Sequence, residues 1–444
     1  MPLSSRTLGL LCLCTCTVLG GTLASCEPSE RRTSVILVSI DTLRADHMGL
    51  HGYARDTTPF LDRWAKDARV FDHAYTTAAW TLVAHMSMLT GLYPQQHHVT
   101  STELALAGEV PLLAERLHAA GYRTVGLYYP GMVHERHGFG RGFDVFRTHA
   151  SAEEAGEHLQ EELDRLEDGP FFLFLHLFDV HSSPFHEGES NVYRSPAPFE
   201  EQFLPGAAAR MPAADAEDIW YGRTQLNDAQ LEALVALYDG GIRHVDARLE
   251  DWFGVLERRG LLDDALVIVT ADHGESLGQR GHLSGHGSYW NEGLHVPLIV
   301  RHPRGIGAGE RVTPAVSLTD VVPTVLDVLG LARDDSLPGR SLFGPLDADR
   351  IVAGEREPDV QEYVLRWPLK IVRFRKSGSY VSGDLAADPT ETHLTRQPEA
   401  LFRSLLDEAL GPGRFPPARP IAGPSTAEQD ALRELGYAGE VDTE

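Results

Sequence analysis

Residues 35–46 read VILVSIDTLRAD, and residues 265–276 read ALVIVTADHGES. Each stretch is a run of aliphatic and β-branched residues followed by potential metal ligands, which are Asp41 in the first and Asp272 and His273 in the second. Apolar runs of this length predict strands that are covered on both faces, as in a parallel sheet. Because ligands bind beyond the carboxyl ends of such strands, we expect the three side chains to share one metal site.

Around these two strands the sequence alternates strand-like and helix-like segments, which indicates an α/β fold. The further elements predicted for this part are strands at 122–128 and 171–177 and helices at 112–120 and 231–256. We therefore expect a large domain over residues 35–345, with a mostly parallel or mixed central sheet between helices. Residues 182–223 show no clear periodicity, and we interpret them as a long surface insertion near the site.

The pattern changes after about residue 345, where short strand-like runs follow one another. An amphipathic helix is predicted at 399–410, after these runs. A small antiparallel-sheet subdomain followed by a tail is therefore expected over residues 346–444.

All cysteines lie within the first 26 residues, and Arg6 precedes the apolar stretch 8–19 there. This order is typical of a secretory signal, and the stretch is too short to span a bilayer as a stable helix. Residues 23–26, LASC, resemble the lipobox of bacterial lipoprotein precursors, in which cleavage leaves Cys26 lipid-modified. The alternative is an ordinary signal in which this cysteine is incidental.

The lipobox interpretation predicts a signal peptide at 1–25 and an anchor cysteine with its tether at 26–34. The protein would then be exported and held in the bacterial cell envelope by a lipid anchor, facing the periplasm or the cell surface.

The formal net charge of −25 argues against nucleic acid as a partner, because affinity for a phosphate backbone comes from clustered Lys and Arg. An anionic substrate would still need a local cation. The only lysines are Lys66, Lys370 and Lys376, so a metal ion or an arginine is expected in that role.

Ordered motifs along most of the chain extend these observations. They are IDTLRADHMGLHGY at 40–53, TTPFLDRWA at 57–65, AYTTAAWTLVAHMSMLTGLYP at 74–94, FLHLFDVHSSPF at 174–185, ADHGES at 271–276, HVPLIV at 295–300, VSLTDVVPTVLDVLGL at 316–331 and LAADPTETH at 385–393. In order and approximate spacing this series resembles the sulfatase family of the alkaline phosphatase superfamily. The resemblance implies a large α/β domain with a smaller C-terminal sheet, and hydrolysis of anionic esters.

The resemblance also implies roles for single residues. Asp41, Asp272 and His273 match metal ligands of the family, whereas Thr42 stands where many sulfatases carry another ligating Asp. His181 matches a histidine that contacts the substrate or the leaving group. His286 lies where many sulfatases place a lysine against the sulfate group.

One divalent cation is expected in this site. The resemblance favours calcium, which is the family habit, while an imidazole ligand and a threonine oxygen leave Zn²⁺ or Mn²⁺ as alternatives.

The sequence departs from the family at residues 80–85, WTLVAH. Sulfatases carry there a C/S-x-P-S/A-R signature whose first residue is converted to formylglycine, and this chain has Thr81 without the proline or the arginine. Threonine is not a substrate for that conversion. Thr81 is therefore predicted to act directly as the nucleophile and as a metal ligand, because a bound cation lowers the pKa of a hydroxyl. The alternative is a helix N-cap in an inactive descendant.

His85 follows Thr81 by four residues, so it would lie on the same side of a helix that begins there. That position would bring its ring within reach of a bound anion or leaving oxygen. A local capping or stacking role is the alternative.

These residues favour a metal-dependent hydrolase of a sulfuric ester or phosphoester, carried on a small molecule, a glycan or a lipid. A phosphoester is favoured over a sulfuric ester as the substrate. In sulfatases the sulfated formylglycine releases sulfate by eliminating to the aldehyde. A threonine ester has no such exit and has to be cleaved by water. The alternatives are a phospho-group transferase of the same superfamily and a catalytically inactive binding lipoprotein.

Overall fold

A computed structural model describes residues 32–182, 192–212, 216–220, 223–279, 289–356 and 361–426, together with residues 428, 429 and 432. The predicted signal peptide, Cys26 and His286 lie outside the described residues. No helix in the described segments is long and apolar enough to cross a membrane.

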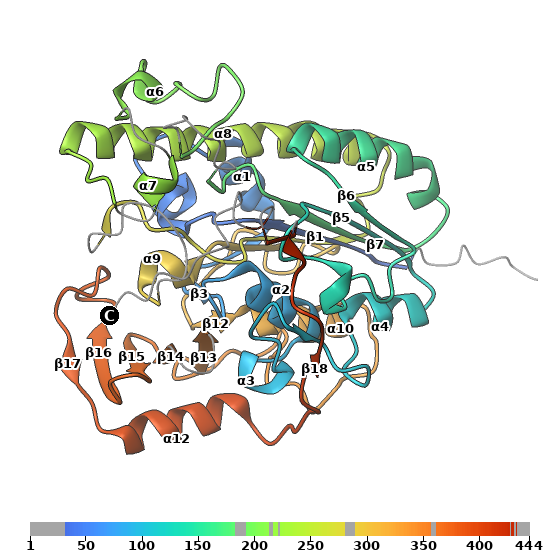
Figure 1. The fold of residues 1–444 in the computed structure, drawn as a ribbon. Helices are drawn as coiled ribbons and strands as arrows, with labels where there is room; N and C mark the ends of the chain where they lie inside the picture. The colour runs from blue at the N-terminus through green and yellow to red at the C-terminus, as the bar shows by residue number, and fades with distance from the viewer. Residues whose placement is uncertain are drawn as a thin grey trace, which may run out of the picture. The chain divides into compact units, whose positions relative to one another are not determined.

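The central element is an eight-stranded mixed sheet (Figure 1). Its strands, in spatial order, are β11 (Arg311–Val312), β2 (Arg69–Phe71), β10 (Leu298–Arg301), β8 (Ala265–Thr270), β1 (Ser34–Ile40), β7 (Phe171–Leu177), β5 (Arg123–Tyr128) and β6 (Val145–Thr148). Strand β1 pairs in parallel with β7 on one side and with β8 on the other. The carboxyl ends of these three strands therefore lie at the same edge of the sheet.

Strands β1, β7 and β8 are buried along their whole length, as their largely apolar sequences predict. Helices cover both faces of the sheet (Figure 1). On one face lie α1 (Pro59–Trp64), α5 (Ala152–Leu166) and α8 (Asp228–Arg258). On the other face lie α2 (Thr81–Thr90), α4 (Leu113–Ala119) and α10 (Val321–Val328). The expected α/β class is confirmed.

A separate five-stranded antiparallel sheet follows in the C-terminal part of the chain (Figure 1). Its strands are β13 (Ile351–Arg356), β14 (Gln361–Arg366), β15 (Leu369–Phe374), β16 (Ser379–Asp384) and β17 (Thr395–Arg396). Helix α12 (Glu399–Leu410) packs against it, with Phe402 against Tyr380. The expected small antiparallel sheet is confirmed, while the domain boundary at residue 345 stays a prediction.

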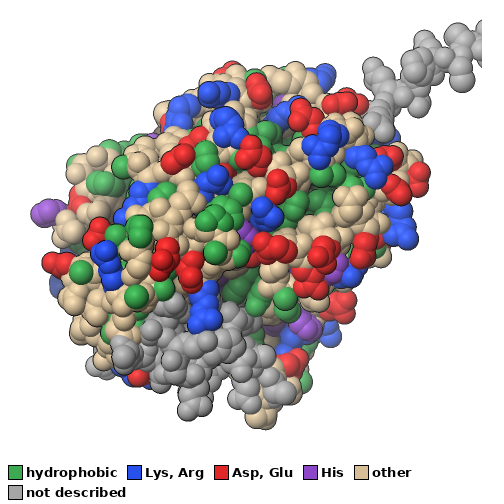
Figure 2. All heavy atoms as spheres, turned by 90° about the horizontal axis from the view of Figure 1, so that it is seen from above, with side chains coloured by type: hydrophobic (Ala, Val, Ile, Leu, Met, Phe, Trp, Pro, Cys, Tyr) green, Lys and Arg blue, Asp and Glu red, His purple; other side chains and the backbone are tan. Residues whose placement is uncertain are grey.

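Short elements complete the described fold. They are β3 (Ala74–Tyr75), β4 (Leu104–Ala105), β9 (His295–Val296), β12 (Val316–Ser317), β18 (Arg419–Pro420), the 3₁₀ turns η1 (Ala45–His47), η2 (Gly49–His51), η3 (Ala65–Asp67), η4 (Glu135–His137) and η6 (Leu318–Asp320), and helices α3 (Pro94–His97), α6 (Ala207–Arg210), α7 (Ala216–Trp220) and α9 (Asn291–Leu294). Helices α6 and α7 fall within the predicted insertion at 182–223. Figure 2 shows Lys and Arg interspersed with Asp and Glu on the described part of one face.

Candidate active site and metal centre

The ends of three parallel strands bring together the side chains on which the site depends. Asp41 follows β1 directly, Asp272 lies two residues beyond β8, and His176 is on β7 opposite Ser39 of β1. Asp41 and Asp272 have no exposed surface, and His176 is 1% exposed. The predicted meeting of Asp41 and Asp272 at one sheet edge is therefore seen in the structure.

The two carboxylate oxygens of Asp41 differ in their contacts. Its Oδ2 accepts hydrogen bonds from His176 Nε2 at 2.9 Å and from Thr81 Oγ1 at 3.3 Å. Its Oδ1 has no hydrogen-bond partner among the described residues and lies 3.7 Å from His273 Nε2. Burial raises the pKa of Asp41, although the neighbouring His181 and His273 oppose that effect.

The two carboxylate oxygens of Asp272 differ in the same way. Its Oδ1 accepts from the backbone N–H of His273 at 2.8 Å and of Thr42 at 3.3 Å. Within the part of the chain that the structure describes, its Oδ2 has no hydrogen-bond partner, and it lies 3.5 Å from His273 Nε2. Burial raises the pKa of Asp272, and the negative charge of Asp41 raises it further. Two buried carboxylates with an unpartnered oxygen each therefore face the same small volume.

Backbone conformation contributes to this arrangement at Thr42. Its φ of +57° lies in the left-handed region, which a β-branched residue rarely adopts. Strain of this kind costs about 1–3 kcal/mol and persists only where the surroundings impose it. The hydroxyl of Tyr238 on α8 donates to the Thr42 carbonyl at 2.7 Å, which helps hold its N–H toward Asp272.

His273 is oriented through its backbone neighbours. Its Nδ1–H donates to the Gly274 carbonyl at 2.8 Å, which leaves Nε2 toward Thr81 Oγ1 at 3.1 Å. Gly274 packs so closely against α9 that a Cβ there would lie 2.0 Å from the Glu292 carbonyl oxygen. Burial lowers the pKa of His273, but the carboxylates of Asp272 and Asp41 outweigh it, so the net shift is upward.

These donors fit a divalent cation. One ligand atom each from Asp41, Asp272 and His273 lies within 4.8 Å of the other two. Ligands of a tetrahedral ion with bonds of about 2.1 Å lie about 3.4 Å apart. The 3.5 Å and 3.7 Å separations of His273 Nε2 from Asp272 and Asp41 are close to that spacing. A cation would also remove the cost of two buried like charges.

Thr81 is the first residue of α2, and its hydroxyl lies at the edge of this group. The preceding Trp80 is extended, and every residue of α2 is buried. Thr81 Oγ1 is 3.3 Å from Asp41 Oδ2 and 3.1 Å from His273 Nε2. The positive end of a helix favours negative charge at this position. The structure thus places a hydroxyl beside two of the predicted ligands.

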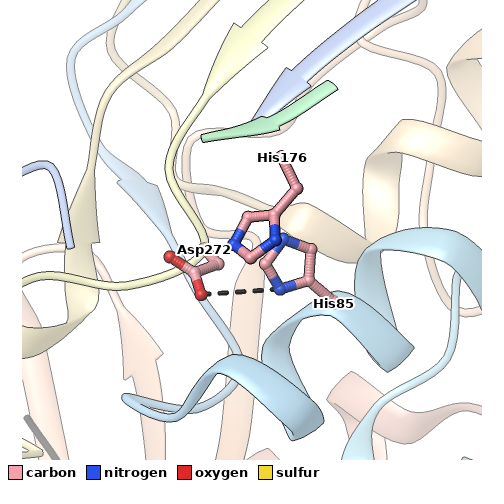
Figure 3. A group of neighbouring side chains, drawn as sticks. All are labelled: His85, His176 and Asp272. Carbon is pink, nitrogen blue, oxygen red and sulfur yellow. Dashed lines mark ion pairs between the residues drawn. The ribbon is translucent and has the colours of Figure 1, made fainter. Parts of the chain in front are cut away.

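His85 lies one turn after Thr81, as the spacing predicts, with its ring buried near Asp272 (Figure 3). Its Nδ1 is 2.9 Å from the Thr81 carbonyl oxygen and 3.5 Å from Asp272 Oδ2. Its Nε2 is 3.0 Å from the Ser39 hydroxyl. Burial, reinforced by the neighbouring His176, lowers the pKa of His85 to about 3.

His181 lies beyond the end of β7 and stacks on Phe178, with ring centroids 4.0 Å apart. Its Nδ1–H donates to the Ser182 carbonyl at 3.0 Å. Burial lowers the pKa of His181 to about 4, against an opposing effect of the Asp41 charge. The catalytic roles predicted for His85 and His181 remain predictions.

Sequence reasoning assigned no role to His176, although it contacts a predicted ligand directly. The signal that could have found it is a polar residue near the end of an otherwise apolar strand, FFLFLHL at 171–177. Parallel pairing of β7 with β1 then brings such a residue beside Asp41.

Comparison of the sequence with known families matches the Sulfatase family model over residues 33–331. Among curated proteins, the chain is 26% identical over 401 residues to the multifunctional alkaline phosphatase superfamily protein PehA of Trinickia caryophylli, covering 70% of this chain and 76% of the relative. It is 23% identical over 406 residues to an N-acetylglucosamine-6-O-sulfatase of Bacteroides thetaiotaomicron, covering 72% of each.

Solved structures with the same fold include two phosphonate monoester hydrolases. The enzyme of Agrobacterium radiobacter superposes with a TM-score of 0.66 at 22% identity, over 81% of this chain and 90% of that one. The enzyme of Silicibacter pomeroyi superposes with a TM-score of 0.67 at 20% identity, over 85% and 94%.

Proposed function

Since the chain belongs to the sulfatase family, whose curated relatives are ester hydrolases, we propose that it is a metal-dependent phosphoester hydrolase with Thr81 as nucleophile. The observation that carries this proposal is the position of the Thr81 hydroxyl. It lies at the first turn of α2, 3.3 Å from Asp41 Oδ2 and 3.1 Å from His273 Nε2.

The cation would be held by the unpartnered oxygens of Asp41 and Asp272 and by His273 Nε2. When bound, it supplies positive charge that lowers the pKa of a nearby hydroxyl and stabilises charge on the transferred group. Because calcium prefers oxygen ligands, the imidazole of His273 favours Zn²⁺ or Mn²⁺ over it.

In the proposed reaction Thr81 Oγ1 attacks phosphorus, and the bond from phosphorus to the leaving oxygen breaks. The hydroxyl proton passes to Asp41 Oδ2, which already accepts a hydrogen bond from Thr81 Oγ1 and is not the oxygen proposed to hold the cation. His181 is proposed to contact the leaving oxygen, because its ring is near enough to Asp41 for their charges to interact. Water then attacks the phosphothreonine, which releases phosphate and restores the hydroxyl.

Phosphorus is proposed over sulfur because of the residue at position 81. A formylglycine hydrate releases sulfate by eliminating to its aldehyde, and a threonine ester cannot. Phosphothreonine can instead be hydrolysed by an activated water. PehA is named as a multifunctional protein of the alkaline phosphatase superfamily, and the two structural neighbours are named as phosphonate monoester hydrolases, which supports a substrate other than a sulfate ester.

The test compares aryl phosphate monoesters, phosphate diesters, phosphonate monoesters and sulfates, using the wild type and Thr81→Ala with added Zn²⁺, Mn²⁺ or Ca²⁺. We expect phosphorus esters to be preferred, and kcat to fall by on the order of 10³-fold or more in Thr81→Ala. Thr90→Ala is a matched control, because Thr90 is equally buried in the last turn of the same helix.

Full activity in Thr81→Ala would exclude the nucleophile assignment, and a preference for sulfate would exclude the substrate class. A product that forms only with an added hydroxyl acceptor would indicate a phospho-group transferase instead. Absence of both turnover and metal binding would favour an inactive binding protein.

Cys26 is proposed as the lipid anchor, because residues 23–26, LASC, resemble a lipobox and follow the short apolar stretch 8–19. The folded part would then work in the bacterial cell envelope. Fractionation of cells that express the full chain tests this proposal. We expect Cys26→Ala to move the protein out of the membrane fraction, and retention there would contradict lipidation.

A further inference from the structure

A group of ligand-type side chains that shares no residue with the candidate metal centre lies where helices α5 and α8 run side by side (Figure 1). It consists of Glu153, Asp179 and His244, and one ligand atom from each lies within 4.8 Å of the other two. Glu153 is in the first turn of α5, Asp179 follows β7, and His244 is in α8. Three separate elements of the fold therefore meet at this group.

The ring of His244 is fixed through one nitrogen. Its Nε2 lies 2.7 Å from Glu153 Oε1. Burial raises the pKa of Glu153, but hydrogen bonds, the one from His244 foremost, outweigh it, so the net shift is downward. Because an ionised carboxylate only accepts hydrogen bonds, Nε2 carries the proton, and Nδ1 of the neutral ring keeps its lone pair.

The other nitrogen of His244 faces Asp179. Nδ1 lies 3.9 Å from Asp179 Oδ1, which is too far for a hydrogen bond. It has no hydrogen-bond partner among the described residues, and the His244 side chain is only 1% exposed. A buried polar atom in this state costs about 1–3 kcal/mol, so a ligand that takes up this lone pair would stabilise the fold.

Asp179 also has an oxygen available. Its Oδ1 accepts from the backbone N–H of Ala152 at 3.0 Å, whereas its Oδ2 lacks a hydrogen-bond partner within the described segments. Burial raises the pKa of Asp179, and the negative charge of Glu153 adds to that effect, although the Ala152 N–H and His244 oppose it. The contacts described for the two carboxylates include no Lys or Arg that would balance their charge.

Packing holds the two donors in place. The ring of Phe199 lies over His244, with centroids 5.3 Å apart. Helix α8 approaches the segment after β7 so closely that a Cβ at Gly241 would lie 3.0 Å from the Asp179 carbonyl oxygen. Asp179 and His244 are therefore positioned before any ligand binds.

We propose that Glu153, Asp179 and His244 form a divalent-cation site that links α5, α8 and the segment after β7. Asp179 and His244 Nδ1 contact the ion, and Glu153 holds the imidazole through Nε2–H, as is usual around a metal-bound histidine. Carboxylate oxygens, water and one imidazole suit Mn²⁺. Ligands of an octahedral ion with bonds of about 2.1 Å lie about 3.0 Å apart when adjacent and about 4.2 Å apart when opposite. The 3.9 Å between Nδ1 and Oδ1 falls within that range.

Cation binding is measured without substrate, so the result does not depend on the proposed function. The side chain of Glu153 is 46% exposed and that of Asp179 is 12% exposed, which lets water complete the shell. Binding is therefore expected to be weaker than at the fully buried centre. The full chain carrying Asp272→Asn, which is expected to empty that centre, is titrated with Mn²⁺ while electron paramagnetic resonance measures the unbound ion. We expect one Mn²⁺ per folded chain, and its loss when His244→Gln or Asp179→Asn is added.

His158→Gln in the same background is the matched control. His158 is a buried histidine of α5 that lies 3.7 Å from a carboxylate oxygen of Glu154, and its Nδ1 also lacks a partner among the described residues. It belongs to none of the potential cation groups found in the described segments, so this variant should keep the ion. Circular dichroism checks that every variant is folded.

Two kinds of result would overturn the proposal. One is a folded Asp272→Asn chain that binds no Mn²⁺, or that binds as much after His244→Gln and Asp179→Asn are added. The other is loss of the ion in folded His158→Gln as well, because the loss would then follow from removing any buried histidine of this region.

Discussion

Two buried carboxylate regions of this molecule differ in how their charges are balanced. At the turn η6, Asp320 accepts hydrogen bonds from both terminal nitrogens of Arg350, with Nη1 at 2.6 Å. It also accepts from the backbone N–H of Arg340 at 2.8 Å and of Ser317 at 2.9 Å. Asp41 and Asp272 are equally buried, yet one oxygen of each lacks a hydrogen-bond partner in the described segments.

The difference distinguishes Asp320, a structural carboxylate, from Asp41 and Asp272, whose charges are not balanced by an arginine or lysine among their described contacts. Arg350 supplies the positive charge for Asp320 from within the chain, so that pair is complete in the fold. Asp41 and Asp272 have only histidines as potential cations among the contacts described for them, and the negative charge of Asp41 raises the pKa of Asp272 beyond the effect of burial. A buried carboxylate in this second state is a sound starting point for locating a metal site.

The largest effect on activity is expected for a substitution at the candidate metal site. Asp272→Asn removes a metal-binding oxygen, so we expect bound metal to be lost and kcat to fall by on the order of 10³-fold. Thermal unfolding of the metal-free chain should nevertheless show no loss of stability, because a buried charge next to Asp41 has been removed. A clear loss of metal-free stability would show that Asp272 already has its charge balanced.

A large loss of stability is expected, in contrast, when the ion pair between Asp320 and Arg350 is broken. Asp320→Ala leaves Arg350 buried without its partner, and breaking such a pair costs about 3–5 kcal/mol. Urea unfolding of the metal-free protein measures this change, and Asp347→Ala is a suitable control because its contact with Arg340 is exposed at the surface. Equal destabilisation by Asp320→Ala and Asp272→Asn would show that both carboxylates are balanced within the chain, and would contradict the difference between the two regions.

Asp246 lies between the two extremes, because it is buried and accepts from the backbone N–H groups of Phe60 and Leu61. Its nearest cation, Arg243, is 3.6 Å away. Burial raises the pKa of Asp246 from 3.8 to about 6. The folded state therefore binds more protons than the unfolded state between these values, and stability from this group falls as pH rises through that window.

A raised pKa of this size corresponds to at most about 3 kcal/mol between pH 4 and pH 6. We expect the difference in unfolding free energy between wild type and Asp246→Asn to change with pH in that direction. The measurement is urea unfolding at several pH values, and subtraction removes contributions from other groups. A difference that does not depend on pH would contradict the assignment.

The smallest effect concerns metal binding and stability. Free Zn²⁺ at ten times its dissociation constant should stabilise the folded chain by about 1.4 kcal/mol for one site. Thermal unfolding with and without Zn²⁺ measures this gain, and Asp272→Asn should lose it while Asp347→Ala keeps it. A gain that persists in Asp272→Asn would place the stabilising ion elsewhere.

Much of the fold follows from local pattern. Strand β7 and helix α12 have the predicted bounds, because the first is a continuous apolar run and the second an amphipathic segment with clear ends. Helix α8 extends a few residues beyond its prediction at both ends, where the capping residue Asn227 and not hydrophobic periodicity sets the start. The pairing of β1 with both β7 and β8 is non-local, and the local sequence patterns did not predict it.

The site was predictable to the extent that it depends on strand ends. Asp41, Asp272 and Thr81 meet as expected, but the role of His176 depends on its register with Ser39, which no single segment encodes. The left-handed conformation of Thr42 is also imposed by contacts from elsewhere, including Tyr238 of α8. Tertiary contacts of this kind have no signature in local sequence.

The central position of β1 has a consequence for biosynthesis. This strand leaves the ribosome first among those of the main sheet, but its partner β8 follows more than 200 residues later. Until then one edge of a largely apolar strand lacks its neighbour, which makes partly synthesised chains prone to aggregate. Completion of the sheet and assembly of the two-carboxylate pocket coincide, so acquisition of metal would report that the chain has finished folding.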